Sequence, residues 1–255
     1  MRVIALLTDF GTEDGFVGAV KGVIKSINPA VSIVDITHGI ESFDILEGAL
    51  ILSSTYRYFP EGTVFVSVVD PGVGTERRPI VVKTEKYFFV APDNGVVSLA
   101  VKDQKIEKII EIKNEDFMLK RDTETFHGRD IFAPVSAYIS RGIPLDMLGK
   151  ELKDIKRINL PEPEIKDNTM TGQIIKFDKF GNCITNIKEL PDFYEIEING
   201  ITIKKVVKSF LEGERESLNL IKGSFGFYEI FVPEGSCKDI FKLKKGDRIL
   251  IKLKR

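Results

Sequence analysis

Hydrophobic positions follow two alternating spacings over roughly the first 150 residues. The apolar run RVIALLT at 2–8 has the length of a buried strand, and apolar residues over 16–27 then recur at helical spacing. A short apolar stretch at 33–34, a helical pattern over 43–56 and the run TVFVSVV at 63–69 continue the alternation. Such a pattern is typical of an α/β sheet covered by helices on its faces.

The pattern changes after residue 157. The segment NLPEPEIKDN carries two prolines and several charges, and it predicts a linker over 158–168. Beyond it, short β-like runs separated by Gly, Asn or Asp turns indicate a small all-β barrel or sandwich. We therefore expect a mixed or parallel sheet flanked by helices at 1–157, and a smaller all-β barrel domain at 169–255.

Composition and charge narrow the classes of partner. The chain has 37 basic and 38 acidic side chains, which gives no net field to attract nucleic acid or an anionic membrane. Neither Cys183 nor Cys237 has the spacing of a zinc site or a disulfide framework. There is no basic leader with an apolar core, and no apolar run approaches the ~20 residues that span a bilayer. We expect a soluble, cytoplasmic protein with a small neutral or zwitterionic ligand.

Two predicted strands of the first domain are followed by charged side chains. The segment TDFGTEDG places Asp9 at a strand end, where its carboxylate can hold ligand hydroxyls. Asp14 is either a second ligand group or the N-cap of the next helix. The segment VVDPGVGTERRP places Asp70 at a strand tip, with Arg77 and Arg78 on the same loop. Taken alone, that loop could be a Pro-Gly turn with solvated arginines, and chemistry does not separate the two arginines.

The two histidines of the chain differ in their surroundings. His127, in TFHGRDIFAP, lies before a helical pattern and beside charged residues, which suits proton transfer, although a structural role is the alternative. His38 lies in DITHGI and is interpreted as structural.

A further polar segment, FDKFGNCITN, lies in the β-rich half. Asp178, Phe180 and Asn182 offer a carboxylate, an aromatic ring and an amide that can pair with a base edge. The alternative is a hairpin turn in which Gly-Asn has an ordinary turn role.

Together these segments resemble the SAM hydroxide adenosyltransferases, hydrolytic relatives of the fluorinase and chlorinase that use S-adenosyl-L-methionine (SAM). The resemblance spans nearly the whole chain and rests on seven segments in order: TDFGTEDGFVGAVKG, DITHGIESFDILEGA, VVDPGVGTERRP, APDNG, TFHGRDIFAP, FDKFGN and GSFGF. It implies an α/β domain joined to a β-barrel domain, and homotrimers whose active sites lie between one subunit's first domain and its neighbour's second.

The resemblance also implies an activity: hydrolysis of SAM to adenosine and L-methionine by attack of water at the ribose C5′, without a metal or cofactor. The water-activating residues would be Asp70, His127 and Arg77, whose spacing of seven residues from Asp70 selects it over Arg78. We hypothesise that Asp70 and His127 take or share the proton of the water while Arg77 orients Asp70 as a carboxylate. The sulfonium makes methionine a neutral leaving group, so positioning of the water is the main requirement.

Substrate contacts follow from the same matching. The ribose would contact Asp9 and Phe43, and Phe126 would be a further substrate-binding residue. The adenine would contact Asn182 and the backbone near Glu234, with Phe180 and Phe210 as apolar contacts. The methionine end would contact Asp14, Asp178 and Ser224, although Phe225 replaces an arginine of the fluorinase there.

Two rival functions remain on sequence grounds. Halide transfer is disfavoured because Gly128 stands where the fluorinase presents a serine, and because the charge of Asp70 beside His127 repels a halide. A catalytically silent SAM or adenosine sensor would use the same binding residues.

Overall fold

The computed structural model describes residues 2–254, apart from the side chain of Tyr194. Contacts divide the chain into two compact units, with the break between Ile158 and Asn159. None of the helices in the described residues combines the length and the apolar character needed to cross a membrane.

The first unit contains a seven-stranded mixed sheet in the order β2-β1-β3-β5-β4-β6-β7. The pairs β1–β2, β1–β3 and β3–β5 are parallel, whereas β4 pairs with β5 and β6, and β6 with β7, in antiparallel fashion. The strands are β1 (Val3–Thr8), β2 (Ser32–Thr37), β3 (Val64–Val68), β4 (Pro79–Thr84), β5 (Phe88–Pro92), β6 (Ile106–Ile112) and β7 (Gly149–Glu151).

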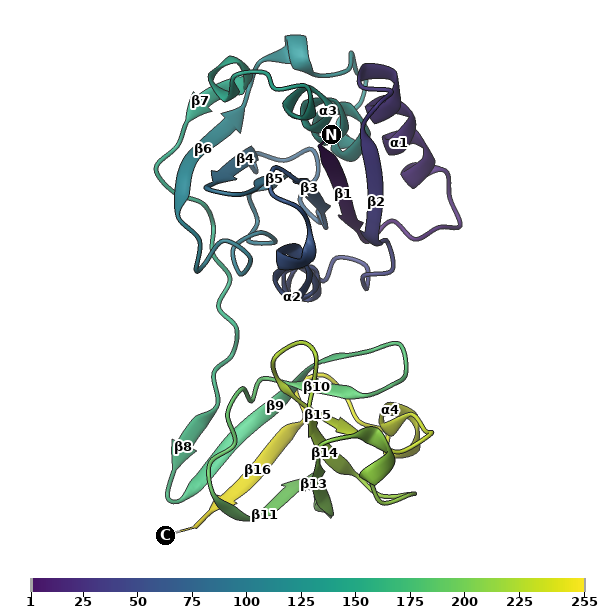
Figure 1. The fold of residues 1–255 in the computed structure, drawn as a ribbon, viewed down its shortest axis with the longest axis vertical. Helices are drawn as coiled ribbons and strands as arrows, with labels where there is room; N and C mark the ends of the chain where they lie inside the picture. The colour runs from purple at the N-terminus through teal and green to yellow at the C-terminus, as the bar shows by residue number, and fades with distance from the viewer. Residues whose placement is uncertain (1, 255) are drawn as a thin grey trace. The chain divides into compact units, whose positions relative to one another are not determined.

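Helices cover both faces of this sheet, as Figure 1 shows. The helices are α1 (Phe16–Ile27), α2 (Ile45–Thr55) and α3 (Ala133–Ser140), the last preceded by a π-helical turn (Gly128–Phe132). Side chains of β1 alternate between the two cores: Ile4 and Leu6 pack on the face of α1 and α3, whereas Ala5 and Leu7 pack on the other. The continuous apolar run at the N-terminus is thus explained by burial on both faces.

The second unit is one curled, half-barrel sheet with the strand order β12-β11-β16-β9-β10-β15-β14-β13, and β8 paired to β9. Its strands are β8 (Glu164–Lys166), β9 (Thr169–Phe177), β10 (Cys183–Thr185), β11 (Phe193–Ile198), β12 (Ile201–Thr202), β13 (Lys205–Val207), β14 (Asn219–Lys222), β15 (Tyr228–Phe231) and β16 (Arg248–Leu253). A single helical turn, α4 (Cys237–Ile240), precedes β16. The predicted fold class, α/β followed by a smaller all-β part, is confirmed.

The segment predicted as a linker over 158–168 contains a strand. Residues 164–166 form β8, which pairs antiparallel with the start of β9. The turn between them consists of Asp167 and Asn168, both with positive φ (47° and 60°). Asp and Asn tolerate this left-handed conformation, which a two-residue hairpin requires. The sequence pattern does not indicate this hairpin, because the prolines at 161 and 163 interrupt the periodicity just before the strand.

Candidate active site

The carboxyl ends of two neighbouring parallel strands place the first group of functional candidates. Thr8 of β1 pairs with Val68 of β3, so Asp9 and Asp70 both follow strand ends at one edge of the sheet. Ligands of open α/β sheets bind at this edge. The loop from β3 to β4 turns back through Gly74, whose φ of 76° and close approach to the backbone of Glu124 exclude a side chain. This turn directs Arg77 toward Asp70.

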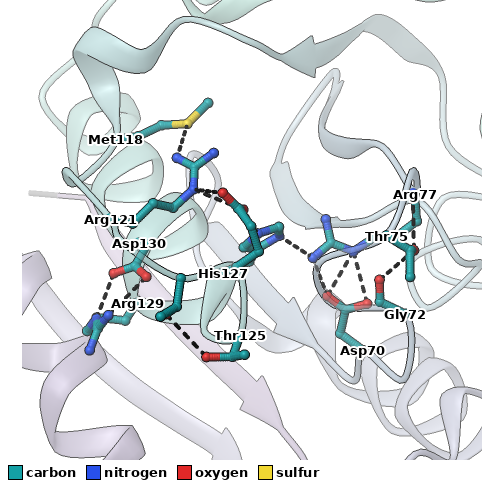
Figure 2. A network of polar contacts seen from close by, with 12 residues as sticks. Asp70, Gly72, Thr75, Arg77, Met118, Arg121, Thr125, His127, Arg129 and Asp130 are labelled. Atoms are coloured by element: carbon teal, nitrogen blue, oxygen red, sulfur yellow. Dashed lines mark hydrogen bonds and ion pairs between the residues drawn. The ribbon is translucent and has the colours of Figure 1, made fainter.

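Asp70, Arg77 and His127 form one chain of polar contacts (Figure 2). Arg77 Nε donates to both carboxylate oxygens of Asp70, at 3.0 and 2.9 Å, and Arg77 Nη2 donates to Oδ2 at 2.5 Å. The same Nη2 lies 2.6 Å from Nδ1 of His127. The side chains of Arg77 and Asp70 are only 6% and 5% exposed. Burial makes such charge-assisted bonds strong and fixes their geometry.

The contacts of His127 determine its tautomer. Because a guanidinium only donates hydrogen bonds, Nδ1 must accept from Arg77, and the ring proton is therefore on Nε2. That nitrogen lies 2.6 Å from Glu124 Oε2. Glu124 also accepts from Arg121 Nε at 3.0 Å, and these hydrogen bonds from His127 and Arg121 lower the pKa of Glu124. His127 is thus a neutral imidazole held between a cation and an anion.

Glu124 and Arg121 extend this network and were missed by the sequence reasoning. Glu124 lies three residues before His127 in an exposed, charge-rich segment, where acidic residues are usual without any function. The only available signal is its spacing from the histidine.

The other candidates of the first unit are Asp9, Phe43, Phe126 and Asp14. Asp9 and Phe43 contact each other, Phe126 belongs to an aromatic cluster, and Asp14 is exposed. Asp9 Oδ2 accepts from the backbone N of Phe43 at 2.9 Å, and Phe43 has a φ of 71° with its ring exposed. Phe126 packs edge-on against Phe10 and Phe16, with ring centroids 5.6 and 5.2 Å apart. Asp14 is exposed, and the N-cap of α1 is Gly15, so the capping alternative for Asp14 is wrong.

Gly128 has a steric reason to be glycine. A Cβ at this position would lie 2.9 Å from Phe10 Cζ and 3.1 Å from Phe126 Cε2. A serine here therefore requires those two rings to move.

Six candidates of the second unit line one cavity with a volume of about 740 Å³. They are Asp178, Phe180, Asn182, Phe210, Ser224 and Glu234. A cavity of this size fits a ligand of several hundred daltons. The FDKFGN segment forms a hairpin turn, with Gly181 at a φ of 83°, so the turn interpretation is confirmed, and ligand binding by this segment stays a prediction.

Asp178 organises that turn. Its Oδ1 accepts from the backbone N of Phe180 and of Asn182, at 2.9 and 2.8 Å, and its Oδ2 accepts from Asn182 Nδ2 at 2.9 Å. The cavity also contains Glu229, a buried glutamate on β15 that sequence reasoning missed. Its neighbours in FYEIFV make it look like a solvent-facing position of an alternating strand.

One cluster of carboxylates in residues 2–254 has the spacing of a metal site: Glu41, Asp44 and Glu47. These groups also serve the start of α2, because Asp44 Oδ1 accepts from the backbone N of Glu47 at 2.8 Å and Glu47 Oε2 accepts from that of Glu41 at 3.4 Å.

Comparison with known proteins finds one matching family and several similar proteins. Residues 4–149 match the N-terminal domain, and residues 172–250 the C-terminal domain, of the SAM hydroxide adenosyltransferases. The chain is 40% identical to an (R)-S-adenosyl-L-methionine hydrolase of Methanocaldococcus jannaschii over 90% of this chain and 88% of that one. It is 29% identical to a fluorinase of Actinoplanes over 83% of this chain and 78% of that one.

A solved structure has a similar fold. The crystal structure of an uncharacterized conserved protein from Thermotoga maritima is 37% identical, with a TM-score of 0.88 over 97% of this chain and 99% of that one. Since the family match covers more than half of the chain and the archaeal hydrolase aligns along most of it, the protein belongs to the SAM hydroxide adenosyltransferase family.

Proposed function

We propose that this protein hydrolyses SAM to adenosine and L-methionine by attack of water at the ribose C5′. The observation that carries the proposal is the buried chain Asp70–Arg77–His127, in a protein that belongs to the SAM hydroxide adenosyltransferase family. In the reaction the water oxygen bonds to C5′, the C5′–sulfur bond breaks with its electron pair going to sulfur, and one proton is released.

Asp70 is the proposed general base. A carboxylate has about four acceptor positions, and the bonds from Arg77 leave acceptor capacity on Oδ1 for a water. Transfer of the proton to a positioned carboxylate increases the reaction rate about 10²- to 10⁴-fold. Placing the water in line behind C5′ contributes a further ~7 kcal/mol.

Arg77 is the proposed orienting group for both Asp70 and the water. Its Nη1 is buried and has no hydrogen-bond partner in residues 2–254. A buried donor without a partner costs about 1–3 kcal/mol, which is recovered when an oxygen binds there. The oxygen of the attacking water, or one of the substrate, suits this position.

His127 then acts as a positioning residue rather than as the base. Both ring nitrogens are already engaged, Nδ1 by Arg77 and Nε2 by Glu124. The imidazole therefore fixes the guanidinium, which in turn fixes Asp70. This divides the roles that the residue types alone left open.

Substrate recognition is proposed to use both units. Asp9 and Phe43 would contact the ribose, and Asp14 the methionine end, as the family resemblance implies, and Phe126 would be a further substrate contact. The cavity of the second unit would bind the adenine and would provide the other contacts to the methionine end, from Asp178 and Ser224. We propose a homotrimer in which each site combines the first unit of one subunit with the second unit of its neighbour, and a reaction that needs no metal or cofactor because its leaving group is a neutral thioether.

The experiment is to incubate the purified protein with SAM and separate the products by chromatography. The proposal predicts adenosine and methionine in equal amounts. Tight adenosine binding with no product would instead favour a sensor, and 5′-chloroadenosine formed in excess chloride would favour halide transfer.

A further inference from the structure

Glu229 of β15 is a buried carboxyl without a partner. Glu229 is 5% exposed, and its cross-strand neighbours are Ile184 of β10 and Ile221 of β14. Among the described residues, no hydrogen bond or ion pair involves its carboxyl group. A carboxyl in this position needs a donor or a cation from elsewhere, because burial without one is unfavourable.

Gly223 makes room for this carboxyl. An added Cβ at residue 223 would lie 1.8 Å from Glu229 Oε1, so any other residue would displace the glutamate. Both residues line the 740 Å³ cavity, which shows that the unpartnered group borders the space where a ligand fits.

The other carboxylates of the cavity are already occupied. Asp178 accepts three hydrogen bonds from its own loop, and Glu234 pairs with Arg215 at 3.1 Å. Glu229 is therefore the buried carboxyl of this cavity that accepts no hydrogen bond within the described residues.

The cations nearby have other contacts. Lys222, which lines the cavity, donates to the carbonyl of Lys188 and lies over the ring of Tyr228, and Lys176 of β9 donates to the carbonyl of Phe177 at 3.0 Å. Burial, and secondarily the charge of Asp178, raise the pKa of Glu229 to about 7. The carboxyl can therefore ionise near neutral pH when a cation approaches.

We propose that Glu229 binds the α-ammonium group of the methionine moiety of SAM, an inference that rests on the proposed function. An ammonium offers three N–H donors and a positive charge. These are the partner and the counter-charge that the buried carboxylate needs. The sulfonium has no N–H or O–H to donate, and adenosine is neutral. Asp178, which the resemblance also assigns to the methionine end, holds Asn182 and the turn in place.

The test measures ligand binding to the full-length protein by calorimetry at pH 8. Glu229→Gln should weaken SAM binding about 10- to 100-fold, the range for loss of one charged hydrogen-bonding partner, and leave adenosine binding within about twofold. An SAM analogue with hydroxyl in place of the amino group should bind the wild type and the variant equally. Glu164→Gln, which changes an exposed strand glutamate of the same unit, is the matched control and should bind SAM like the wild type.

Three further measurements support this test. SAM binding to the wild type near pH 6.5 should release a proton, because Glu229 must ionise, and Glu229→Gln should abolish the release. Gly223→Ala should reproduce the selective loss of SAM binding by displacing the carboxyl. Thermal unfolding of each variant separates a folding defect from a binding defect.

The outcomes separate this proposal from the hydrolase proposal. Unchanged SAM binding in Glu229→Gln, or equal losses for SAM and the hydroxyl analogue, would overturn the role of Glu229 whatever the turnover. Selective loss of SAM binding in a protein that yields no adenosine would retain it and reject hydrolysis. Failure of the wild type to bind SAM would overturn both.

Discussion

Arg77 Nη2 lies 2.6 Å from Nδ1 of His127, and this contact makes the histidine an acceptor. The imidazole is then neutral, with its proton on Nε2 and directed to Glu124 Oε2. Arg77 consequently connects His127 to Asp70. The relationship predicts different consequences for substitutions of the three residues.

Asp70→Asn removes the proposed base and preserves the size of the side chain. We expect kcat to fall about 10²- to 10⁴-fold, because the amide cannot take the proton, with little change in the dissociation constant for SAM. Single-turnover kinetics and calorimetry measure the two quantities separately. Loss of SAM binding at an unchanged kcat would show that Asp70 is a substrate ligand only.

Substitutions of His127 test positioning. Its imidazole accepts from Arg77 and donates to Glu124, and the amide of His127→Gln can do both, whereas the ring of His127→Phe can do neither. We expect about 10-fold more activity from the glutamine variant than from the phenylalanine variant, the equivalent of ~1.4 kcal/mol. Equal activities in two folded variants would argue against a positioning role.

Gly128→Ser tests the distinction from halide transfer. Its Cβ would press on the rings of Phe10 and Phe126, and we expect a loss of about 1–3 kcal/mol in the free energy of unfolding. The variant should still form no 5′-chloroadenosine, because the charge of Asp70 remains. Chemical denaturation and chromatography provide the two readouts, and chlorinated product would mean that Gly128 alone controls the nucleophile.

Dialysis against a chelator tests the proposed independence from metals. The carboxylates of Glu41, Asp44 and Glu47 have suitable spacing, but they also bond to the start of α2. We expect unchanged turnover after treatment. If chelation abolished the activity and a divalent cation restored it, this cluster would have a catalytic or structural role as a metal site.

Glu229 should make stability dependent on pH. Its pKa of about 7 in the folded protein is raised from the ordinary value of 4.5, so the folded state binds more protons between these values and stability falls as pH rises from 4.5 through 7. At pH 8 Glu229→Gln should be more stable than the wild type by about 1–3 kcal/mol, allowing for partial screening, and the difference should vanish at pH 4. Urea unfolding at both pH values measures this difference in the free energy of unfolding. A difference that is the same at pH 4 and pH 8 would show that ionisation of Glu229 does not cause it.

Much of the fold could be predicted because its elements carry strong periodic signals. The run at 2–8 is β1, and the apolar spacing over 16–27 matches α1, since both bury their apolar side chains in the two cores of the first unit. The strand at 164–166 was missed because it is short, exposed and preceded by prolines. Its pairing depends on a two-residue turn rather than on a hydrophobic face.

The site was predictable only in part. Asp70, Arg77 and His127 were named through a family resemblance, and their contacts support the distinct roles that we propose for them. Glu229 has no such signal, because its importance depends on a cavity and on the missing Cβ of Gly223, both products of tertiary structure.

The central claim is attack of water at the ribose C5′, and hydrolysis in ¹⁸O-labelled water tests it most directly. Mass spectrometry of the products should find one ¹⁸O atom in adenosine, as its 5′-hydroxyl, and unlabelled methionine in an equal amount. Methylthioadenosine as product, or adenosine without the label, would contradict the claim.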